Sequence, residues 1–394
     1  MHTYHEALSL ILAERKNLGT EKVALEKANG RVLAQNIYAD RDYPPFNRAA
    51  MDGYCFECTD TILLNEYKCV DTIFAGGTSE KTLQKSECFK IMTGAAVPLP
   101  ANMIVRVEDA KAENDIISFS IENVNPFQNI AKQGEDVKLD ELTIISGTAI
   151  NNSVIGALAS LGKYEVEVYK LPNVAIISTG NEIKKVDDKV STIQIRDSNS
   201  FTIAAFLAKF KIESIHKALV RDVASELETQ IAKALENDII IISGGVSAGD
   251  ADFIPQILKA LDVNQIFHKV KIKPGKPIWF GKGKEGQIVF ALPGNPVSVQ
   301  VTCRIFVEPF LRACFSLATD NSFFLPLAQE KKKKVKLDEF FPCKLENMTK
   351  TQILPLHFNG SGDITATLGS DGIGLHTIAH ENLSKDTTIQ FFPW

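Results

Sequence analysis

The feature of the sequence that most restricts the possible folds is a run of four isoleucines at residues 239–242. The run is bounded by Asp238 and Ser243, so it has the length of one short strand. Four consecutive β-branched residues are typical of a strand that is buried on both faces, as in a parallel sheet. The run therefore predicts an α/β domain built on a mostly parallel sheet.

A glycine-rich segment follows this strand directly. Gly244, Gly245 and Gly249 allow positive φ and a close approach of the backbone to a ligand. A helix is predicted immediately after the segment, over residues 253–261. A strand, a glycine turn and a helix start expose several N–H groups together, and such groups bind anions. The segment therefore predicts an anion-binding site.

The same segment carries two carboxylates, Asp250 and Asp252. It nearly matches a nucleotide-binding P-loop, but Asp250 stands where that motif requires lysine. Carboxylates would repel a bare phosphate, whereas a divalent cation such as Mg²⁺ can bridge them to the oxygens of an anion. The alternative is that the two aspartates only cap the helix. The segment alone leaves both interpretations open.

Length and composition indicate an ordinary globular protein of two to four domains, since the chain has 394 residues, of which 45% are hydrophobic and 23% charged. The net charge of −5 gives no reason to expect a nucleic acid or an anionic membrane as a partner. No apolar run approaches the ~20 residues of a membrane span. The first residues lack the basic and apolar regions of a signal peptide. We therefore expect a cytoplasmic protein.

The cysteines and histidines give little evidence of a metal site. The seven cysteines do not form the pattern of a disulfide framework. Cys55 and Cys58 form a single C-x-x-C, and a structural zinc site normally needs a second close pair. We expect reduced, partly buried thiols. His376 and His380 have helical ligand spacing, but no glutamate follows His376 as in a zinc protease, so we expect surface histidines.

The first half of the chain predicts a domain that is interrupted by an insertion. Residues 3–16 form an amphipathic pattern, and residues 22–34 are predicted to continue helically. The sequence between 40 and 140 is rich in turn residues and short β-like segments, which indicates a small β domain. A helix is expected at 152–161 and a strand at 164–169. The sequence therefore predicts a first domain whose two parts lie before and after the inserted β domain.

From Pro172 onward, strands alternate with helices, a pattern typical of a mostly parallel, three-layer α/β sheet. Ligands of such sheets bind at the carboxyl ends of the strands. The lysines at 331–334 indicate a solvated linker or strand edge rather than a nucleic-acid arm, and the remainder predicts a small β barrel or sandwich. The expected elements are strand 174–178, helix 200–210, strand 213–220, helix 224–236, strand 239–242, helix 253–261, strand 267–272, a hairpin up to 292 and helix 296–311.

A basic segment lies near the end of this α/β region. Lys269, Lys271 and Lys273 alternate, so on one strand they would share a face. Two prolines stiffen the following loop around Lys276. A solvated strand face is the alternative interpretation. Beside the acidic glycine segment, however, the lysines suit a metal-bridged substrate that carries phosphate.

Two further turns resemble known motifs. Residues 292–298 (LPGNPVS) join a buried strand to a helix through a rigid turn, whose N–H groups would also face an anion. Residues 281–286 fit G-x-G-x-x-G, but they lie between two expected strands. A dinucleotide site needs that motif to open a helix, so residues 281–286 predict a hairpin turn.

The motifs together resemble the molybdopterin molybdenumtransferase family, to which the C-terminal domain of gephyrin belongs. The resemblance covers essentially the whole chain. It implies an elongated homodimer whose active site lies between the α/β domain of one subunit and the inserted β domain of the other. The motifs that carry the resemblance, in order, are PPFNRAAMDGY (44–54), IMTGAAVP (91–98), GED (134–136), STGNE (178–182), DSN (197–199), SGGVSAGDADF (243–253), KIKPGKP (271–277) and LPGNPVS (292–298).

The family fold implies four structural units. Residues 1–40 with 141–171 would form a helical linker domain, and residues 41–140 the inserted β domain. Residues 172–320 would form a three-layer α/β domain of the molybdopterin-binding type. Residues 331–394 would form the C-terminal β barrel. The expected fold class is therefore multidomain α/β plus β.

The resemblance implies that molybdenum from molybdate is inserted into adenylylated molybdopterin, with Mg²⁺-dependent release of AMP. The catalytic residues expected are Asp52, Thr93, Glu182, Asp222 and Asp252. The expected ligands of Mg²⁺ are Glu182, Asp250 and Asp252. The expected substrate-binding residues are Gly244, Gly245, Ser247, Lys269, Lys273, Lys276, Pro293, Gly294, Asn295 and Pro296.

Two other functions share parts of this pattern. A molybdopterin adenylyltransferase has the same kind of α/β domain, but the motifs before it and the β region after it favour the molybdenum-inserting enzyme. A scaffold like gephyrin would not need the carboxylates and lysines together. The resemblance further implies adenylyltransferase and molybdoenzymes as protein partners. The chain departs from the family pattern at Asn47, Ala131 and Ala366, so substrate contacts there are not carried over.

Overall fold

The structure is a computed structural model that describes residues 1–59, 63–121, 125–246, 253–347 and 350–394. Within these ranges, no helix has the length and the apolar character that are required to cross a bilayer. The α/β pattern is confined to the second half of the chain, and the remaining strands are mostly antiparallel.

The chain divides into two compact units, which are described separately. The first unit comprises Met1–Ala34, Gly147–Asn151 and Glu165–Trp394. The second unit comprises Gln35–Ser146 and Asn152–Tyr164. The chain therefore leaves the first unit after Ala34, returns to it at Gly147–Asn151, leaves it again and rejoins it at Glu165. The finer division into four domains stays a prediction.

A six-stranded sheet forms the centre of the first unit, in the order β16-β13-β17-β21-β20-β18. The four strands β16, β13, β17 and β21 are parallel, and β20 and β18 extend the sheet antiparallel. The prediction of a mostly parallel sheet is thus confirmed. Their bounds are β13 (Val174–Thr179), β16 (Ile215–Val220), β17 (Ile239–Ser243), β18 (Asn264–His268), β20 (Trp279–Lys282) and β21 (Ile288–Leu292).

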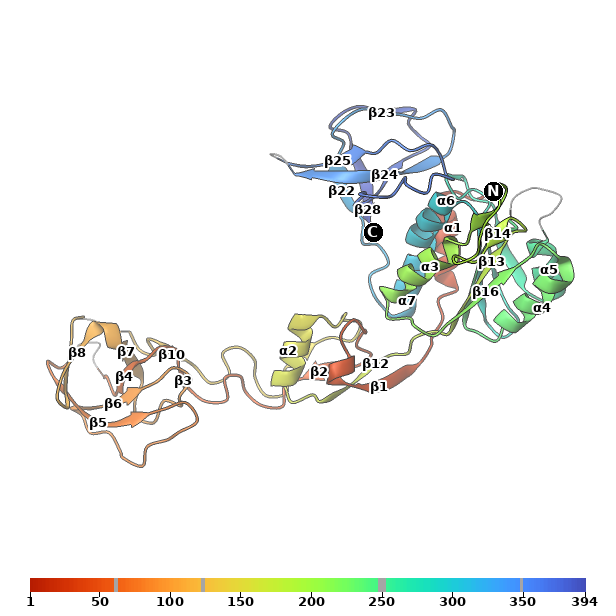
Figure 1. Ribbon diagram of the computed structural model, residues 1–394. Coiled ribbons are helices and arrows are strands. Elements are labelled where there is room, and N and C mark those ends of the chain that lie inside the picture. Colours follow the sequence, from red (N-terminus) through yellow and green to blue (C-terminus); the bar gives the residue numbers. More distant parts are fainter. Residues whose placement is uncertain (60–62, 122–124, 247–252, 348–349) are drawn as a thin grey trace. The chain divides into compact units, whose positions relative to one another are not determined.

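Helices cover both faces of this sheet (Figure 1). Along β17, Ile239 and Ile241 pack into the hydrophobic cluster on one face, and Ile240 and Ile242 pack into the cluster on the other. All four isoleucines are buried, which confirms the prediction from the run. The helices on the first face are α1 (Tyr4–Ala13), α3 (Asn199–Ala208), α6 (Pro296–Thr302), the π-helical segment η3 (Cys303–Val307) and α7 (Glu308–Cys314). Those on the second face are α4 (Ala224–Ala234) and α5 (Ile254–Ala260).

The N-terminal segment differs in part from the expectation. Helix α1 is confirmed and begins with a capping box, in which Thr3 and Glu6 satisfy each other's backbone N–H groups. The helical prediction for residues 22–34 is wrong. Strand β1 (Thr20–Ala24) pairs antiparallel with β12 (Glu165–Tyr169), followed by a short 3₁₀ turn, η1 (Leu25–Lys27). Pairing with a distant strand overrides the local helical propensity of these residues.

The C-terminal residues form a second six-stranded sheet, called here the C-terminal sheet. Its main order is β19-β24-β26-β28-β22, and β25 pairs with β24. The bounds are β19 (Ile272–Lys273), β22 (Phe323–Pro326), β24 (Asp338–Asn347), β25 (Thr351–Pro355), β26 (Gly372–His376) and β28 (Thr388–Pro393). A separate pair consists of β23 (Lys331–Lys332) and β27 (Asn382–Leu383), so the lysine run begins at a strand edge, as expected.

The predicted strand at 267–272 is divided between the two sheets. Strand β18 ends at His268, and Lys269 has a left-handed φ of 71°. Strand β19 then pairs with β24 of the C-terminal sheet. The prediction that Lys269, Lys271 and Lys273 share one strand face is therefore wrong, because the left-handed residue breaks the alternation.

A buried polar network joins the α/β layers to the C-terminal sheet. Arg304, from η3, is buried and donates hydrogen bonds to the carbonyl of Pro393 and to Oδ1 of Asn321, the latter at 2.7 Å. Its Nε also lies 3.6 Å from Oε2 of Glu308. Asn321 in turn donates to Oε1 of Glu308 at 3.1 Å. Every member of the network thus has a charged or polar partner.

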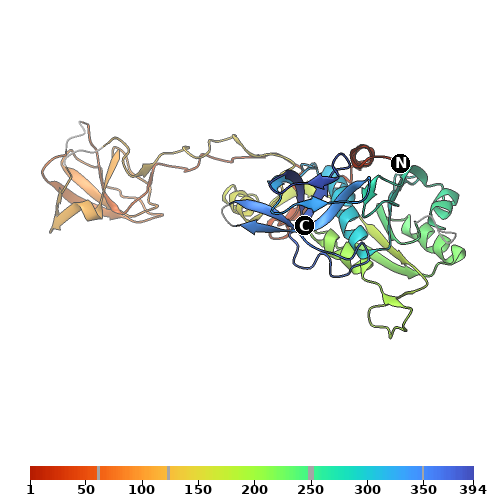
Figure 2. The same cartoon turned by 90° about the horizontal axis from the view of Figure 1, so that it is seen from above.

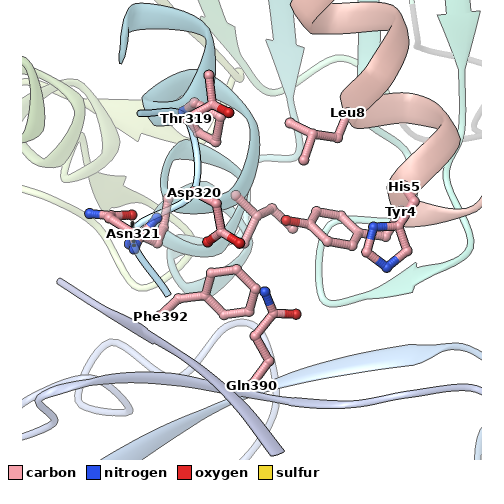
Figure 3. Close-up of a pocket in the computed structure, with 11 residues that line it drawn as sticks. Tyr4, His5, Leu8, Thr319, Asp320, Asn321, Gln390 and Phe392 are labelled. Atoms are coloured by element: carbon pink, nitrogen blue, oxygen red, sulfur yellow. Dashed lines mark hydrogen bonds between the residues drawn. The ribbon is translucent and has the colours of Figure 1, made fainter. Parts of the chain in front are cut away.

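A small cavity of about 80 Å³ lies beside this network (Figure 3). Tyr4 of α1 and Phe392 of β28 both face it. The ring of Tyr4 packs edge-on against Phe340 and Phe392, with centroids 5.3 and 6.4 Å apart. Residues from the beginning, middle and end of the chain therefore meet in one aromatic and polar junction.

His376 is buried in β26 and is not the surface histidine that we expected. Its Nε2 lies 2.9 Å from the carbonyl of His380, and its buried Nδ1 has no hydrogen-bond partner in the part of the chain that the structure describes. Nearby, Nζ of Lys333 donates to the carbonyls of Leu337 and His376. Burial, reinforced by Lys333, lowers the pKa of His376 to about 4.

We expect this histidine to make the protein less stable in acid. The unfolded chain, with an ordinary histidine pKa of about 6.5, binds the proton more tightly than the folded chain. The free energy of unfolding should therefore fall as the pH decreases from about 6.5 to 4. Urea denaturation at pH 7.5 and 4.5 should show a smaller loss in His376→Phe than in the unchanged protein. His380→Phe, which replaces an exposed histidine, should retain the full loss.

The second unit is built on a six-stranded sheet in the order β7-β4-β6-β5-β9-β8. Hydrophobic clusters cover both of its faces. The β-rich insertion that the sequence predicted is therefore present in this unit. The sheet strands are β4 (Gly53–Phe56), β5 (Tyr67–Ile73), β6 (Glu87–Ile91), β7 (Met103–Arg106), β8 (Ala110–Glu113) and β9 (Ile116–Phe119). The unit also contains β2 (Ile37–Tyr38), β3 (Arg48–Ala49), η2 (Val107–Asp109), β10 (Ile130–Ala131), β11 (Leu142–Ile144) and α2 (Asn152–Ser160).

Candidate functional site

A cavity of about 910 Å³ lies at the carboxyl ends of the four parallel strands of the first unit. This is where the sequence placed the site, because ligands of open α/β sheets bind at that edge. The volume lies within the range of small-molecule sites. The lining residues used below are Thr179, Glu182, Ile195, Asp197, Asn199, Asp222, Gly244, Gly245, Pro277, Pro293, Gly294, Asn295, Pro296 and Ile364.

The glycine turn after β17 forms one wall of this cavity. Gly244 has a φ of 104°, and a Cβ on it would lie 2.4 Å from the carbonyl oxygen of Thr179. Gly245 has a φ of 65°, and a Cβ there would lie 2.7 Å from Cγ1 of Ile254. Neither position accepts a side chain without a shift of its neighbours. The backbone of the turn is therefore held close to β13 and open to the cavity.

Carboxylates line the ends of two neighbouring strands. Glu182 is exposed and follows β13, and Asp222 follows β16. Thr179 donates a hydrogen bond from its hydroxyl to Asp222, whose own backbone N–H donates to Asn181 at 3.2 Å. The predicted Glu182 and Asp222 thus line one cavity together with Gly244.

Asn199, at the start of α3, was not among the predicted site residues. Its Nδ2 donates to Oγ of Ser243 at 2.8 Å and to the carbonyl of Gly294 at 2.6 Å, which ties β17 to the turn before α6. Its Oδ1 is buried and has no hydrogen-bond partner among the described residues, although Asn199 lines the cavity. A buried oxygen in this state can accept a hydrogen bond from a ligand. Asn199 belongs to the DSN motif at residues 197–199. The motif predicts a helix start, but it does not indicate that Asn199 could accept a hydrogen bond from a ligand.

A neighbouring aspartate has a structural role. Oδ1 of Asp197 accepts hydrogen bonds from the hydroxyl of Ser178, at 3.0 Å, and from the backbone N–H of Ser200, at 3.1 Å. Asp197 therefore fixes the start of α3, and with it Asn199, to the end of β13.

Apolar side chains also reach the cavity from outside the sheet. Strands β14 (Ile183–Lys184) and β15 (Ile195–Arg196) pair in the excursion between β13 and α3, which projects from the sheet, yellow-green in Figure 2. Ile195 and, from the C-terminal part of the unit, Ile364 both line the cavity while remaining 58% and 73% exposed. They offer an apolar surface to a planar ligand group.

A second cavity, of about 240 Å³, adjoins the first and shares Pro277, Pro293 and Asn295 with it. Lys273 and Lys276 line this smaller cavity. It lies between the α/β layers and the C-terminal sheet, since Glu339 of β24 lines it as well. The smaller cavity thus combines cationic side chains with the rigid turn of residues 292–298.

Glu339 forms ion pairs with Lys273, which lines this cavity, and with Lys331. It is buried, and its carboxylate lies 3.7 Å from Nζ of Lys273 and 3.2 Å from Nζ of Lys331. Lys276 is in none of the ion pairs found between described residues, so its charge is available to an anion. Lys269 was also predicted to bind substrate, but in the described part of the chain it lines neither cavity.

Three predicted site residues, Ser247, Asp250 and Asp252, lie outside the described residues. The described residues alone contain no group of three histidine, cysteine, aspartate or glutamate side chains that could hold a metal ion. Of the three carboxylates predicted to bind Mg²⁺, the structure therefore describes Glu182.

The remaining predicted site residues, Asp52 and Thr93, lie in the second unit and contact one another. Both the backbone N–H and the hydroxyl of Thr93 donate to Oδ1 of Asp52 at 2.7 Å. These two bonds lower the pKa of Asp52 below its usual value, so the carboxylate is ionised at neutral pH. The pair joins the start of β4 to the turn after β6.

Comparisons with known proteins agree with this architecture. Residues 2–162 match the MoeA N-terminal region (domains I and II), and residues 175–313 match a probable molybdopterin binding domain. The chain is 31% identical to the molybdopterin molybdenumtransferase of Staphylococcus epidermidis, over 92% of this chain and 88% of that protein. It is 29% identical to that of Synechocystis, over 98% of both.

Among solved structures, the molybdopterin biosynthesis MoeA protein of Pyrococcus horikoshii OT3 matches the whole of both chains. The TM-score is 0.86 at 29% sequence identity. The fold is therefore the multidomain α/β plus β fold of MoeA proteins. On these matches, the chain belongs to the molybdopterin molybdenumtransferase family and is a transferase.

Proposed function

We propose that the protein transfers molybdenum from molybdate to adenylylated molybdopterin and releases AMP. The observation that carries the proposal is the pair of adjoining cavities, one large with glycine turns and carboxylates, one small with lysines. A pterin nucleotide and a tetrahedral oxyanion need sites of these two sizes and chemistries. The shared wall would bring the two substrates next to each other.

In the larger cavity, the residues would bind and orient the nucleotide. Gly245 in the glycine turn, and Gly294 and Asn295 before α6, would offer backbone N–H groups to phosphate oxygens, whereas the N–H of Gly244 already donates to the carbonyl of Leu292. The Oδ1 of Asn199, which has no partner in the described part of the chain, would accept a hydrogen bond from an N–H or O–H group of the substrate. Ile195 and Ile364 would cover a planar ring and exclude water from it.

In the smaller cavity, Lys276 would bind molybdate oxygens by charge-assisted hydrogen bonds. Lys273 would contribute positive charge while Glu339 holds it in position. Asp222 lies at the other side of the large cavity, where its carboxylate could accept a proton from attacking water.

We further propose Mg²⁺ as cofactor, held by Glu182 with Asp250 and Asp252. Glu182 has the oxygen donors that Mg²⁺ prefers. When bound, the ion would neutralise the charge of the phosphates. Of these three ligands, Glu182 belongs to the described residues. A homodimer, in which Asp52 and Thr93 of the partner copy complete the site, is also part of the proposal.

The proposal is tested by AMP release. Purified protein is mixed with adenylylated molybdopterin, and AMP is measured with and without molybdate and Mg²⁺. The proposed function requires release that depends on both. Release without molybdate would indicate simple hydrolysis. Formation of adenylylated molybdopterin from ATP would indicate an adenylyltransferase. The absence of both reactions would favour a scaffold. Each of these three results contradicts the proposal.

Asn199→Ala is expected to lower kcat/KM for AMP release by about 10- to 100-fold, since a buried hydrogen bond to a ligand contributes about 1–3 kcal/mol. Asn237→Ala is a matched control, because Asn237 precedes the opposite end of β17 and its side chain donates to Ala234. The control should keep the activity of the unchanged protein. Equal effects in both variants would show that Asn199 does not contact the substrate.

A further inference from the structure

The second unit contains two cysteines that face each other across neighbouring strands. Strands β5 and β6 are parallel, and their register places Cys69 opposite Cys88. Both thiols belong to the same hydrophobic cluster, on one face of the sheet. Cys88 is fully buried, whereas Cys69 is half-buried and accessible from solvent.

Cys69 Sγ lies 3.5 Å from the carbonyl of Asp71, and a hydrogen bond from the neighbouring Cys88 thiol acts on it as well. This bond lowers the pKa of Cys69 to about 6, with help from backbone groups at Lys90 and Asp71 and against the effect of burial. The pKa of Cys88 is raised by the same bond. The pair therefore loses its first proton readily and holds the second, which is how coupled groups behave.

The other thiols with a resolved shift are less acidic than usual. Burial raises the pKa of Cys55 to about 12 and that of Cys314 to about 11. It also raises the pKa of Cys303 and Cys343. The thiolate is the reactive form of cysteine, so among the thiols with a resolved shift the reactive one is Cys69.

We propose that Cys69 is a site of oxidation by hydroperoxides and that Cys88 is its resolving thiol, so that the pair closes a reversible disulfide between β5 and β6. Paired residues on adjacent strands lie about 5 Å apart at Cα, which is within the range that disulfides span. The strand register and the shared hydrophobic cluster place both side chains on the same face of neighbouring strands. No large rearrangement of the sheet is needed.

The chemistry balances with hydrogen peroxide as the oxidant. The Cys69 thiolate attacks one peroxide oxygen, an S–O bond forms, the O–O bond breaks, and hydroxide leaves. Cys88 sulfur then attacks the sulfenic acid, an S–S bond forms, the S–O bond breaks, and a second hydroxide leaves. The protons of the two thiols convert the hydroxides to water. Two thiols lose two electrons in total and one peroxide gains them.

Peptide mapping of the full-length protein tests the proposal directly. Trypsin separates Cys69 and Cys88 into the peptides 69–81 and 86–90, and leaves Cys55 and Cys58 together in 49–68. After treatment with peroxide and blocking of free thiols, we expect peptides 69–81 and 86–90 linked, at their summed mass less two hydrogen atoms. Dithiothreitol should separate them. Free thiols at both positions, or oxidation confined to Cys55 and Cys58, would overturn the proposal.

The order of attack is tested by variants and by pH. Cys88→Ser should stop at a sulfenic acid on Cys69, trapped as a dimedone adduct, whereas Cys343→Ser should form the linked peptides as before. Lack of the adduct would overturn the assignment of Cys69. In the unchanged protein, iodoacetamide should label Cys69 with a midpoint near pH 6, against about 8.5 for an ordinary thiol. A midpoint near 8.5 would contradict the proposal, independently of any transferase activity.

Discussion

Replacing Arg304 with methionine is expected to lower the free energy of unfolding of the first unit by about 3–5 kcal/mol, the usual cost of removing one partner from a buried ion pair. Methionine retains much of the side-chain volume but removes the donors to Pro393 and Asn321. Glu308 would then be buried without its cation. Urea denaturation followed by circular dichroism measures the change.

Arg312→Met provides the control for this experiment. Arg312 lies two turns further along the same helical segment and donates to the carbonyl of Ala318, but it is only half-buried. Its replacement should cost about 1 kcal/mol or less. If the two variants lose the same stability, the junction around Arg304 is not a principal source of cohesion between the α/β layers and the C-terminal sheet.

Replacing Gly244 with alanine is expected to reduce AMP release by about 100-fold or more. The new Cβ would meet the carbonyl of Thr179 at 2.4 Å, so the turn must move away from β13. A displacement of about 1 Å in a substrate-positioning loop is enough for a loss of this size. A non-glycine residue at this positive φ also costs about 1–2 kcal/mol of stability. Thermal unfolding and the AMP assay measure the two effects.

Gly294→Ala is the matched control for stability. Gly294 lines the same cavity, but a Cβ on it would lie 3.6 Å from Cα of Gly244, which is an ordinary contact. The variant should unfold within about 0.5 kcal/mol of the unchanged protein. If Gly244→Ala is as stable and as active as the unchanged protein, the close approach of the turn to β13 is not needed for function.

The sequence was most informative where one structural element determines the pattern. The isoleucine run required burial on both faces, and the polar loops fell at the carboxyl ends of the strands because parallel strands place them there. Residues 281–286 connect two antiparallel strands, as the hairpin prediction required. Each of these inferences rested on short-range periodicity or turn chemistry.

The sequence was less informative where a distant segment determines the outcome. Residues 20–24 form a strand because β12 pairs with them, and His376 is buried because β24 and β28 flank it. The lysine alternation failed at Lys269, whose backbone conformation is set by the passage from one sheet to another. The position of Asn199 depends on Ser243 and Gly294, which lie 44 and 95 residues away. Periodicity within a window of residues contains none of this information.

The meeting of Tyr4 with Phe392 has a consequence for the way the chain is made. A ribosome releases the N-terminal helix first, but its aromatic partners in η3, β24 and β28 are synthesised near the end. Long sequence separations of this kind slow folding, because the chain must close a large loop before the contact forms. The second unit draws on residues 35–164 and can complete its core much earlier. On nascent chains, the backbone amides of the second unit should therefore be protected from hydrogen exchange before β28, the last strand of the first unit, has been synthesised.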